Sequence, residues 1–262
     1  MNKTIRIATL IPVYNDEKYL EESIESIFNQ KINSNITNDI FVCLNNSKDK
    51  SNDIVYNIYQ KYNLFFERKN GCSLKKLEQN KFQGTTPTRN RMIHELAVHE
   101  TNWQYDYIAN QDGDDVWIDS LKLQKQIDYL EENKDVDILG TQYIGRIKNQ
   151  NTDPKDYILL DRRPLDHDNC INWLFNGHNP IGNASAVFRR DLFTKIGGYE
   201  DLLPLTEDMW FWYKAALSGA GFANLEDDCL LYNVSNNPNY SPSYPLALKD
   251  IFCKILDARR KI

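Results

Sequence analysis

One segment near the amino terminus decides the fold class: residues 5–17 read IRIATLIPVYNDE. Its first nine residues form an almost continuous apolar run, which is typical of a strand buried on both faces of a parallel sheet. From there to residue 30 the apolar residues recur every three or four positions, as they do on one face of a helix. Asn15, Asp16 and Glu17 place capping and negatively charged groups at the start of that helix. The segment therefore predicts a strand, a turn and a helix in succession.

The same alternation continues along the first half of the chain. A second apolar run at residues 40–44 precedes a helical pattern over residues 54–62, and Thr86-Pro87 indicates the start of a third helix. A strand at residues 107–109, a helix over residues 123–130 and a strand at residues 136–140 follow. Alternating strands and helices connect with right-handed crossovers, so we expect an α/β fold with a mostly parallel central sheet flanked by helices.

The pattern of the second half is less regular. We interpret residues 145–165 as a variable connection between two halves of one domain, at about residues 1–144 and 166–245. Helices are expected near residues 169–175 and after Thr206, and a short helix ends at Gly197-Gly198, a pair that suits a helix carboxyl terminus. Strands are expected at residues 184–188, 221–225 and 229–234. An amphipathic helix over residues 246–262 is predicted to pack on the domain.

Composition excludes several classes of protein. The 262 residues include 31 Lys and Arg against 37 Asp and Glu, a net charge of -6, so the chain lacks the overall basic character of a nucleic-acid-binding protein. Its five cysteines are scattered with no C-x-x-C pair, which indicates neither a disulfide framework nor a cysteine zinc site. The first apolar run is too short for a signal peptide or a membrane span. We therefore expect a cytoplasmic protein with no transmembrane segment.

The most specific local feature is an acidic turn, Asp112-Gly113-Asp114-Asp115, which follows the strand at residues 107–109. In an open parallel sheet, ligands bind beyond the carboxyl ends of the strands. Two carboxylates separated by one glycine suit a divalent cation that prefers oxygen ligands, and Trp117 is placed to close over a ligand. The alternative is a polar turn in which an Asp caps the next helix. The position after a buried strand favours the cation site.

A second acidic motif, Thr206-Glu207-Asp208, begins a helix in the second half. A threonine cap with acids in the first turn is ordinary helix chemistry. The functional alternative is that one carboxylate acts as a general base, with Trp210 offering an apolar face to a sugar ring or another flat ligand. Arg89 is a candidate for holding a diphosphate, although arginines on a helix are more often solvated. The spacing of these residues does not decide between the interpretations.

Taken in order along residues 5–235, these motifs resemble the family 2 glycosyltransferases, an inverting group with the GT-A fold. The matching segments are Ile11-Pro12-Val13-Tyr14-Asn15 with Glu17, Ser47 with Asp49, Thr88-Arg89-Asn90, Gln111-Asp112-Gly113-Asp114-Asp115, Gly197-Gly198-Tyr199, and Thr206-Glu207-Asp208-Met209-Trp210. Each motif is weak by itself, but six of them in the family's order argue against a chance match.

The resemblance implies that the first half binds a nucleotide-sugar donor across the carboxyl ends of its strands and that the second half binds the acceptor. Asp114 and Asp112 would hold Mn²⁺ or Mg²⁺, which would neutralise the leaving diphosphate. Asp208 would be the general base that deprotonates the acceptor hydroxyl, and Glu207 would orient Asp208 or the acceptor. The residues assigned to the donor are Pro12, Tyr14, Asn15, Glu17, Asn45, Arg89, Asp112 and Gly113, and those assigned to the acceptor are Trp210 and Gly198.

Three departures from the family pattern bear on these expectations. Leu44 stands where the family usually has an Asp that reads the base, commonly uracil, and the following Asn45 offers an amide in its place. Tyr232-Asn233-Val234-Ser235 replaces the frequent Tyr-Arg-x-His segment, so Ser235 stands where a histidine often provides a further metal or phosphate contact. No Q-x-x-R-W motif and no transmembrane helix follow, which argues against a processive polysaccharide synthase.

We therefore expect a hexosyl- or N-acetylhexosaminyl-transferase that moves one sugar from a nucleotide-sugar donor to a glycan, lipid-linked or protein acceptor. A UDP-sugar is favoured as donor, and peripheral contact with a membrane is compatible with this function. Two alternatives stay open: a catalytically silent GT-A module that binds a sugar nucleotide or glycan, and a sugar nucleotidyltransferase. The latter would need a Gly-rich, Lys-bearing phosphate loop after the first strand, where this chain has Pro12-Val13-Tyr14-Asn15.

Overall fold

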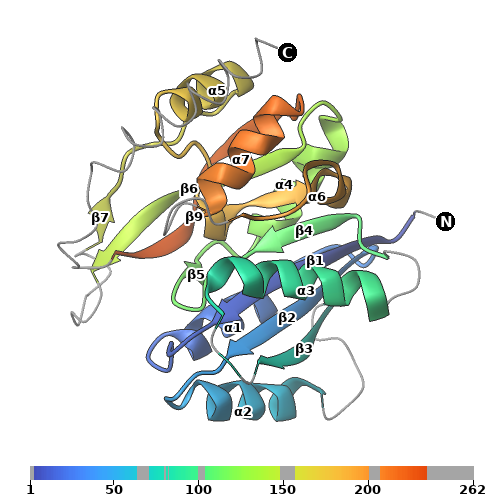
Figure 1. Ribbon diagram of the computed structural model, residues 1–262, viewed down its shortest axis with the longest axis vertical. Helices are drawn as coiled ribbons and strands as arrows, with labels where there is room; N and C mark the ends of the chain where they lie inside the picture. The colour runs from blue at the N-terminus through green and yellow to red at the C-terminus, as the bar shows by residue number, and fades with distance from the viewer. Residues whose placement is uncertain are drawn as a thin grey trace.

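The computed structural model describes residues 3–63, 71–79, 81, 83–99, 104–147, 157–200 and 207–234. Within these residues the chain forms one sheet with helices on both faces (Figure 1). Thr206, Ser235 and the helix expected over residues 246–262 lie outside the described residues.

The first half of the chain builds the parallel part of the sheet. Strands β1 (Ile5–Val13), β2 (Ile36–Asn45), β3 (Cys72–Gln79) and β4 (Tyr107–Asn110) lie in the order β3-β2-β1-β4, and each neighbouring pair is parallel. Helices α1 (Leu20–Phe28), α2 (Ser51–Asn63) and α3 (Thr85–His99) connect them. Because these strands run in one direction, the turns that follow β1, β2 and β4 lie at the same edge of the sheet.

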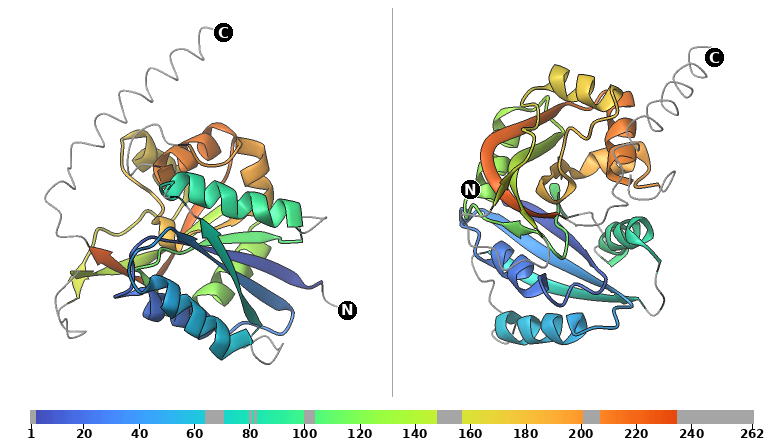
Figure 2. Two further views of the ribbon diagram at one scale, coloured as in Figure 1. Left: turned by 60° about the horizontal axis from the view of Figure 1, so that its bottom comes forward. Right: turned by 90° about the vertical axis from the view of Figure 1, so that its left-hand side faces the viewer.

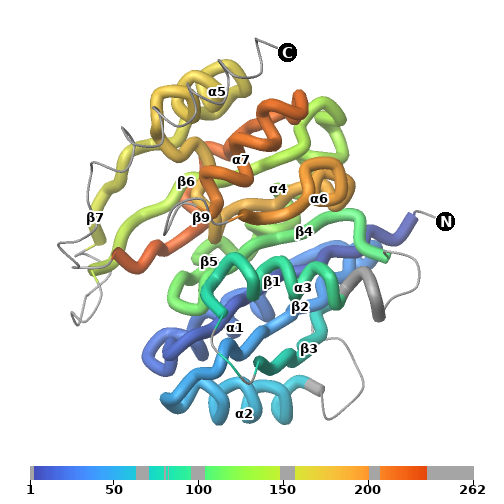
Figure 3. Tube along the Cα trace, viewed as in Figure 1, coloured from blue at the N-terminus to red at the C-terminus, as the bar shows by residue number. Residues whose placement is uncertain are grey.

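The chain after β4 adds strands of mixed direction to the sheet. Strand β8 (Val187–Arg189) is antiparallel to β4 and to β6 (Ile138–Ile147), whereas β9 (Phe222–Val234) is parallel to β6. Two short strands, β5 (Val116–Trp117) and β7 (Ile158–Leu159), pair antiparallel with β9 and β6. The helices are α4 (Lys122–Glu132), α5 (His167–Phe175), α6 (Arg190–Ile196) and α7 (Glu207–Leu217), with a 3-10 turn, η2, at Asn183–Ser185. Figure 3 shows the blue-to-teal part of the chain below most of the yellow-to-red part, with the green strands between them and the sheet running through all three.

Two layers of helices cover the sheet. On one face, the apolar sides of α1, α2 and α4 form a core with alternate residues of β1 and β2. On the other face, α3, α5, α6 and α7 pack against the intervening residues, and the aromatic side chains of α7 fill much of this second core. Figure 2 shows the blue helices α1 and α2 and the teal helix α3 on opposite sides of the sheet. The continuous apolar run of β1 supplies both cores because side chains alternate across a strand.

The structure confirms the α/β fold and corrects the strand assignments. The sequence pattern gave no sign of β3, because this strand carries Lys75, Lys76 and Glu78 and lies at the end of the sheet, where a continuous apolar run is not needed. The strands expected at residues 221–225 and 229–234 are one continuous strand, β9, whose register with β6 shifts near Gln142. Glu226, Asp227 and Asp228 are exposed at this shift, so the apolar pattern is interrupted inside the strand.

Several boundaries also differ from the expectation. Helix α1 begins at Leu20 rather than at residue 17, and the strand expected at residues 184–188 is η2 followed by β8. The connection expected over residues 145–165 includes the end of β6 and all of β7. The predicted helix end at Gly197 is confirmed, because this residue adopts a left-handed φ of 81°. None of the described helices is both long and apolar enough to cross a membrane.

Candidate active site

The turns after β1 and β2 are joined by hydrogen bonds between side chains and backbone. The N–H of Asn15 donates to Ser47 Oγ at 3.2 Å, and the N–H of Lys48 donates to Asn15 Oδ1 at 2.8 Å. Asn15 and Asn46 both have left-handed backbone conformations, with φ of 58° and 59°, which Asn adopts more readily than most residues. The side-chain oxygen of Asn15, a predicted donor-binding residue, is therefore used to hold the neighbouring turn.

Glu17 makes a second, reciprocal link between the same turns. The N–H of Glu17 donates to Asp49 Oδ2 at 2.9 Å, and the N–H of Lys50 donates to Glu17 Oε2 at 2.8 Å. These bonds explain why acidic residues occur in both turns, because the carboxylate of each turn accepts from a backbone N–H of the other turn. Like Asn15, the predicted donor-binding residue Glu17 shapes the turns that border the site.

The two residues at the end of β2 that the family resemblance relates to base recognition are both buried. Leu44 is 2% exposed and packs in the core. The amide of Asn45 is also buried, since its Nδ2 donates to Gly84 O at 3.2 Å and its Oδ1 accepts from the N–H of Gln83 at 3.1 Å. Asn45 therefore holds the segment before α3, whereas the 44% exposed side chain of Tyr14 presents an aromatic surface at this edge. The other predicted donor-binding residue of β1, Pro12, is half-buried.

The acidic turn after β4 is fixed by the elements on either side of it. From α1, Ser23 Oγ donates to Asp112 O at 3.0 Å. From β9, the N–H of Asn233 donates to Asp115 Oδ1 at 2.8 Å, and Asn233 Nδ2 donates to the carbonyl of Asp114. Asp115 is 1% exposed and anchors the turn, whereas Asp112 and Asp114 are only half-buried. The two carboxylates predicted to bind a metal are therefore the two that the turn leaves accessible.

Gly113 is required by its neighbour Asp16. A Cβ at position 113 would lie 2.6 Å from Asp16 Oδ2, which accepts a hydrogen bond from the N–H of Tyr14 at 3.1 Å. Glycine leaves room for this close approach between the turn after β1 and the acidic turn. The sequence assigned Gly113 to the donor and gave Asp16 only a capping role. No local pattern indicates their contact, because the two residues are far apart along the chain.

Arg89, in the first half of α3, is buried beneath the half-buried carboxylate of Asp112. The Arg89 side chain is 1% exposed, and its Nη2 forms an ion pair with Asp112 Oδ1. Its Nε and Nη1 are buried and have no hydrogen-bond partner in the part of the chain that the structure describes. Such unpaired buried donors are rare, and a ligand oxygen or a bound water would satisfy them. Arg89 therefore places a fixed positive charge behind the acidic turn.

Asn90, the next residue, ties α3 to the segment after α6. Its Oδ1 accepts from the N–H of Tyr199 at 2.9 Å, and its Nδ2 donates to Tyr199 O at 2.8 Å. The Tyr199 hydroxyl in turn accepts from Nδ2 of Asn110, which lies two residues before the acidic turn, at 2.7 Å. The Arg-Asn and Gly-Gly-Tyr motifs, which are separate in the sequence, therefore form one support beneath the site.

The second acidic motif opens α7 beside the first. Asp208 Oδ2 accepts from Asn179 Nδ2 at 2.6 Å, and Asp208 Oδ1 accepts from the N–H of Met209 at 2.7 Å. Burial raises the pKa of Asp208 to about 7, and the negative charges of Glu207 and, further away, Asp112 contribute to the rise. A carboxylate whose pKa lies near neutrality is a suitable proton acceptor. The acidic motifs of the two halves therefore lie in one site.

The two predicted acceptor-binding residues are largely enclosed. Trp210 is 8% exposed, and its ring stacks on that of Tyr213 with 5.9 Å between the ring centroids. Its Nε1 donates to Glu200 Oε2 at 3.2 Å. Gly198 has a φ of 82°, and an added Cβ would lie 2.8 Å from the ring of Phe193. Both residues support the wall of the site, and an acceptor contact stays a prediction for each.

The interpretation of Trp117 as a side chain that closes over a ligand is wrong. Its ring is 3% exposed, its Nε1 donates to Ala184 O at 3.1 Å, and Lys122 Nζ lies 3.9 Å from the ring centroid. Burial lowers the pKa of Lys122 to about 7. The sequence was misleading because β5 is buried, so the indole belongs to the core beneath the acidic turn.

The oxygen donors of the acidic turn suit a hard divalent cation. Mg²⁺ and Mn²⁺ bind carboxylate oxygens, and a cation held by one or two carboxylates commonly completes its coordination with substrate phosphates. Asp112 and Asp114 supply two such groups. No cluster of three or more His, Cys, Asp or Glu side chains suited to a metal occurs among the described residues. A cation here would therefore need ligands from the substrate or from residues outside the described ones.

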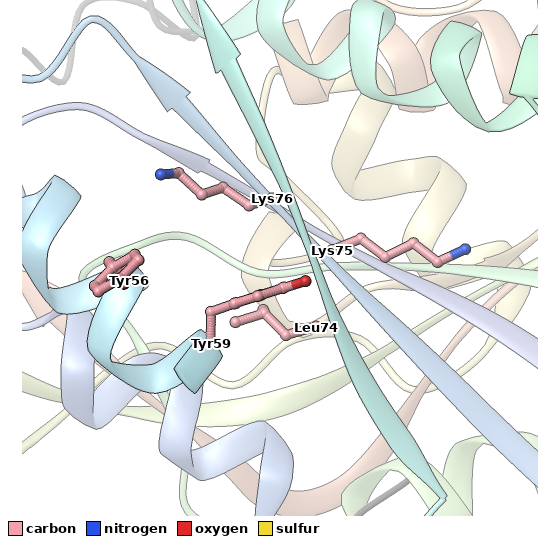
Figure 4. A pocket seen from close by; sticks show the side chains of 5 residues that line it. All are labelled: Tyr56, Tyr59, Leu74, Lys75 and Lys76. Atoms are coloured by element: carbon pink, nitrogen blue, oxygen red, sulfur yellow. The ribbon is translucent and has the colours of Figure 1, made fainter. Parts of the chain in front are cut away.

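A separate surface pocket of about 380 Å³ lies between α2 and β3 at the end of the sheet (Figure 4). Its lining consists of Tyr56 and Tyr59 from α2 and of Leu74, Lys75 and Lys76 from β3. None of the residues predicted to bind the donor, the acceptor or the metal lines it. The candidate active site is therefore the acidic site at the carboxyl ends of β1 and β4, not this pocket.

Comparisons with known proteins identify the family of this chain. The sequence model of the glycosyl transferase family 2 matches residues 9–197. An uncharacterized glycosyltransferase of Methanocaldococcus jannaschii is 27% identical over 237 residues, which cover 89% of this chain and 72% of that protein. The O-antigen biosynthesis glycosyltransferase WbnJ of Escherichia coli is 24% identical over 236 residues, which cover 88% of this chain and 80% of that protein.

Solved structures share the fold at low sequence identity. TarS 1-349 of S. aureus in complex with UDP-GlcNAc matches with a TM-score of 0.66 at 16% identity, over 95% of this chain and 66% of that chain. The mannosyltransferase PcManGT from Pyrobaculum calidifontis, solved with GDP-Man and Mn²⁺, matches with a TM-score of 0.65 at 15% identity, over 97% of this chain and 64% of that chain. This chain thus spans 66% or less of either solved chain. Because the family match runs from β1 through α6, the protein belongs to glycosyl transferase family 2, and its curled α/β structure is a GT-A fold.

Proposed function

We propose that the protein is an inverting glycosyltransferase that moves one sugar from a nucleotide-sugar donor, preferably a UDP-sugar, to a hydroxyl group of a glycan, lipid-linked or protein acceptor. The meeting of two acidic motifs from distant parts of the chain carries this proposal. The charge of Asp112 contributes to the raised pKa of Asp208, and Arg89 interacts electrostatically with both Asp112 and Glu207. The acidic turn that carries Asp112 suits a cation beside the leaving diphosphate, and the motif that carries Asp208 suits the attacking hydroxyl.

Asp208 is the proposed general base. Its carboxylate accepts the proton of the acceptor hydroxyl while the hydroxyl oxygen attacks the anomeric carbon, and the bond from that carbon to the diphosphate oxygen breaks. Attack from the face opposite the diphosphate inverts the anomeric centre in one displacement. With a pKa near 7, Asp208 is ionised in a large share of molecules at neutral pH and still binds a proton readily. Glu207 assists by keeping that pKa high.

Positive charge for the leaving diphosphate has two sources in this proposal. Asp112 and Asp114 would hold Mn²⁺ or Mg²⁺, which would supply positive charge near the phosphate oxygens when bound. The second source is the side chain of Arg89, which belongs to the protein itself. It orients the Asp112 carboxylate through their ion pair and offsets the negative charge of the acidic turn. The acidic turn is thus stabilised in the absence of substrate and retains exposed carboxylate oxygens.

The preference for a UDP-sugar draws support from the structural likeness to TarS, which was solved with UDP-GlcNAc, whereas PcManGT was solved with GDP-Man. The chain lacks the family's usual base-reading Asp, and the amide of Asn45 is used on Gln83 and Gly84. Recognition of the base would then depend on stacking against the exposed ring of Tyr14. Stacking tolerates every base, so we expect the preference for UDP over other nucleotides to be small.

The test is a screen of UDP-, GDP- and TDP-sugars in the presence of Mn²⁺, with release of the nucleoside diphosphate as the readout. We expect turnover of at least one donor by the wild type and its loss in Asp114→Ala, because this change removes a proposed metal ligand. Asp168→Ala is the matched control, since Asp168 is an exposed acid in the first turn of α5.

Each outcome of the screen separates the candidate functions. Donor binding without turnover under any condition would contradict the enzyme and support a silent binding module. Turnover by Asp114→Ala at the wild-type rate would contradict the metal assignment while leaving the transferase proposal in place.

A further inference from the structure

Asn179 lies on the loop between α5 and η2 and contacts Asp208 directly. Its Nδ2 donates to Asp208 Oδ2 at 2.6 Å, and its Oδ1 accepts from the N–H of Ile181 at 3.2 Å. A backbone N–H can only donate, so the side-chain oxygen must face Ile181 and the amide nitrogen must face Asp208. The chain itself therefore fixes the orientation of this amide, which presents a hydrogen-bond donor to the carboxylate.

The loop that carries Asn179 is anchored to the sheet. The Asn179 carbonyl accepts from Arg163 Nη1 at 2.7 Å, and the backbone of Arg163 exchanges two hydrogen bonds with the side chain of Gln142, at 2.7 and 3.0 Å. The carbonyl of Pro180 accepts from Asn224 Nδ2 at 3.0 Å. Gln142 lies on β6 and Asn224 on β9, so the two paired strands determine where the amide of Asn179 sits.

The contact leaves Asp208 able to act on a substrate. Among the residues that the structure describes, each carboxylate oxygen accepts one hydrogen bond, Oδ2 from Asn179 and Oδ1 from the N–H of Met209. A carboxylate oxygen accepts two hydrogen bonds, so each retains an acceptor position for an incoming hydroxyl. The amide donor also favours the ionised carboxylate, which opposes the effects of burial and of Glu207.

We propose that Asn179 is the positioning residue of Asp208: its amide fixes the direction of the carboxylate and keeps it ionised in a buried, acidic site. This inference rests on the proposed function, because Asp208 acts as a base only if the protein transfers a sugar to a hydroxyl. Among the described residues, the charged and titratable groups that act on this pair are Glu207 on α7, Asp112 on the acidic turn, Tyr199 after α6, and Arg163 behind Asn179. Arg89 on α3 acts on Glu207, Asp112 and Tyr199.

The test is the titration of Asp208 in the full chain, followed by the chemical shift of its ¹³Cγ in protein labelled at aspartate. The Asp208→Asn variant assigns the signal by its absence. In Asn179→Asp an oxygen still accepts from Ile181, but a second carboxylate replaces the donor. We therefore expect the last proton to leave the pair at a pH about one unit or more above the wild-type value. In Asn179→Ala the donor is lost without added charge, and we expect a smaller upward shift, about half a unit to one unit.

Asn172→Asp is the matched control. It adds the same charge at an exposed position of α5, and an oxygen at position 172 still accepts from Asn176 Nδ2. We expect it to leave the titration of Asp208 unchanged, because no hydrogen bond joins the two residues. Once a donor and acceptor are known, the acid limb of the kcat profile should move upward in Asn179→Ala with the donor KM unchanged.

The result separates this inference from the proposed function. An unchanged titration of Asp208 in both Asn179 variants would overturn the positioning role, even if Asp208→Asn abolishes transfer. A shifted titration combined with full transfer by Asp208→Asn would overturn the general-base assignment, and the positioning role with it.

Discussion

Two sets of polar motif residues, one from each half of the molecule, are used in opposite ways. In the first half, Asn15, Glu17 and Asn45 direct their side chains to backbone groups of neighbouring turns. In the second half, Asp208 keeps acceptor positions for a substrate, and burial raises its pKa to about 7. The first set of side chains satisfies backbone hydrogen bonds, whereas the carboxylate of Asp208 carries its charge in a buried, acidic environment that disfavours ionisation.

The difference follows from where each set lies. Parallel strands end together, so the turns after them bring many unpaired N–H and C=O groups to one edge, and short polar side chains satisfy them there. The start of α7 needs no such links, since acids in the first turn are favoured by the helix dipole. Substitutions in the first set should therefore reduce stability, and substitutions in the second set should reduce activity.

The largest expected effect is on catalysis. Asp208→Asn should lower the rate of sugar transfer by about 10²- to 10⁴-fold, because it removes the proposed general base while Asn can still accept from Asn179. Donor affinity should stay within about twofold of the wild type, as measured by calorimetric titration with the nucleoside diphosphate and Mn²⁺. Asp168→Asn, a change of the same kind in the first turn of α5, is the control. Equal losses of affinity and rate would show that Asp208 belongs to the donor site.

The same substitution should lower activity but raise stability relative to the wild type at neutral pH. The pKa of Asp208 is raised from 3.8 to about 7, so the folded state binds the proton more tightly than the unfolded state, and wild-type stability falls as the pH rises from about 4 to 7. Asp208→Asn lacks this dependence. Its free energy of unfolding relative to the wild type should increase over that range by up to about 4 kcal/mol, the value for three pKa units. Urea unfolding at several pH values measures the difference, and a constant difference would contradict the raised pKa.

Gly113→Ala tests the contact between the two turns of the donor side. The new Cβ would lie 2.6 Å from Asp16 Oδ2, so Asp16 must turn away and lose its hydrogen bond with Tyr14. We expect a loss of about 1–3 kcal/mol of stability in urea unfolding. A double-mutant cycle with Asp16→Ala should recover part of this loss, because the smaller side chain restores the space. Strict additivity of the two changes would refute the contact.

The smallest expected effect lies in the links between the turns after β1 and β2. Glu17→Ala leaves the N–H of Lys50 without its side-chain partner and should cost about 1 kcal/mol of stability, with the transfer rate per folded molecule nearly unchanged. Glu17→Gln keeps a side-chain oxygen for Lys50 and should lose less than half as much. A large fall in donor affinity in Glu17→Gln would instead show that the carboxylate contacts the donor.

Much of the donor half could be predicted from the sequence. The apolar run of β1, the change of period into α1 and the acidic turn after β4 are local patterns, so the α/β fold and the candidate residues Asp112 and Asp114 follow from them. The candidate Asp208 of the other half came from a second local pattern, Thr206-Glu207-Asp208. Strand β3 could not be predicted, because Lys75, Lys76 and Glu78 hide its apolar residues and its place is set by pairing with β2. The buried position of Trp117 could not be predicted either, because β5 is buried only by elements that pack on it in the tertiary structure.

The sequence by itself determined the order of strands and helices and the chemical groups available for the site, because both are properties of neighbouring residues. The tertiary structure decided which of those groups are used as supports and which keep their acceptor positions. It turned the amide of Asn45 toward the segment before α3, brought Asp16 against Gly113, and placed Asn179 on Asp208. These contacts join residues from different elements, and packing and pairing between elements, not local propensity, fix their distances.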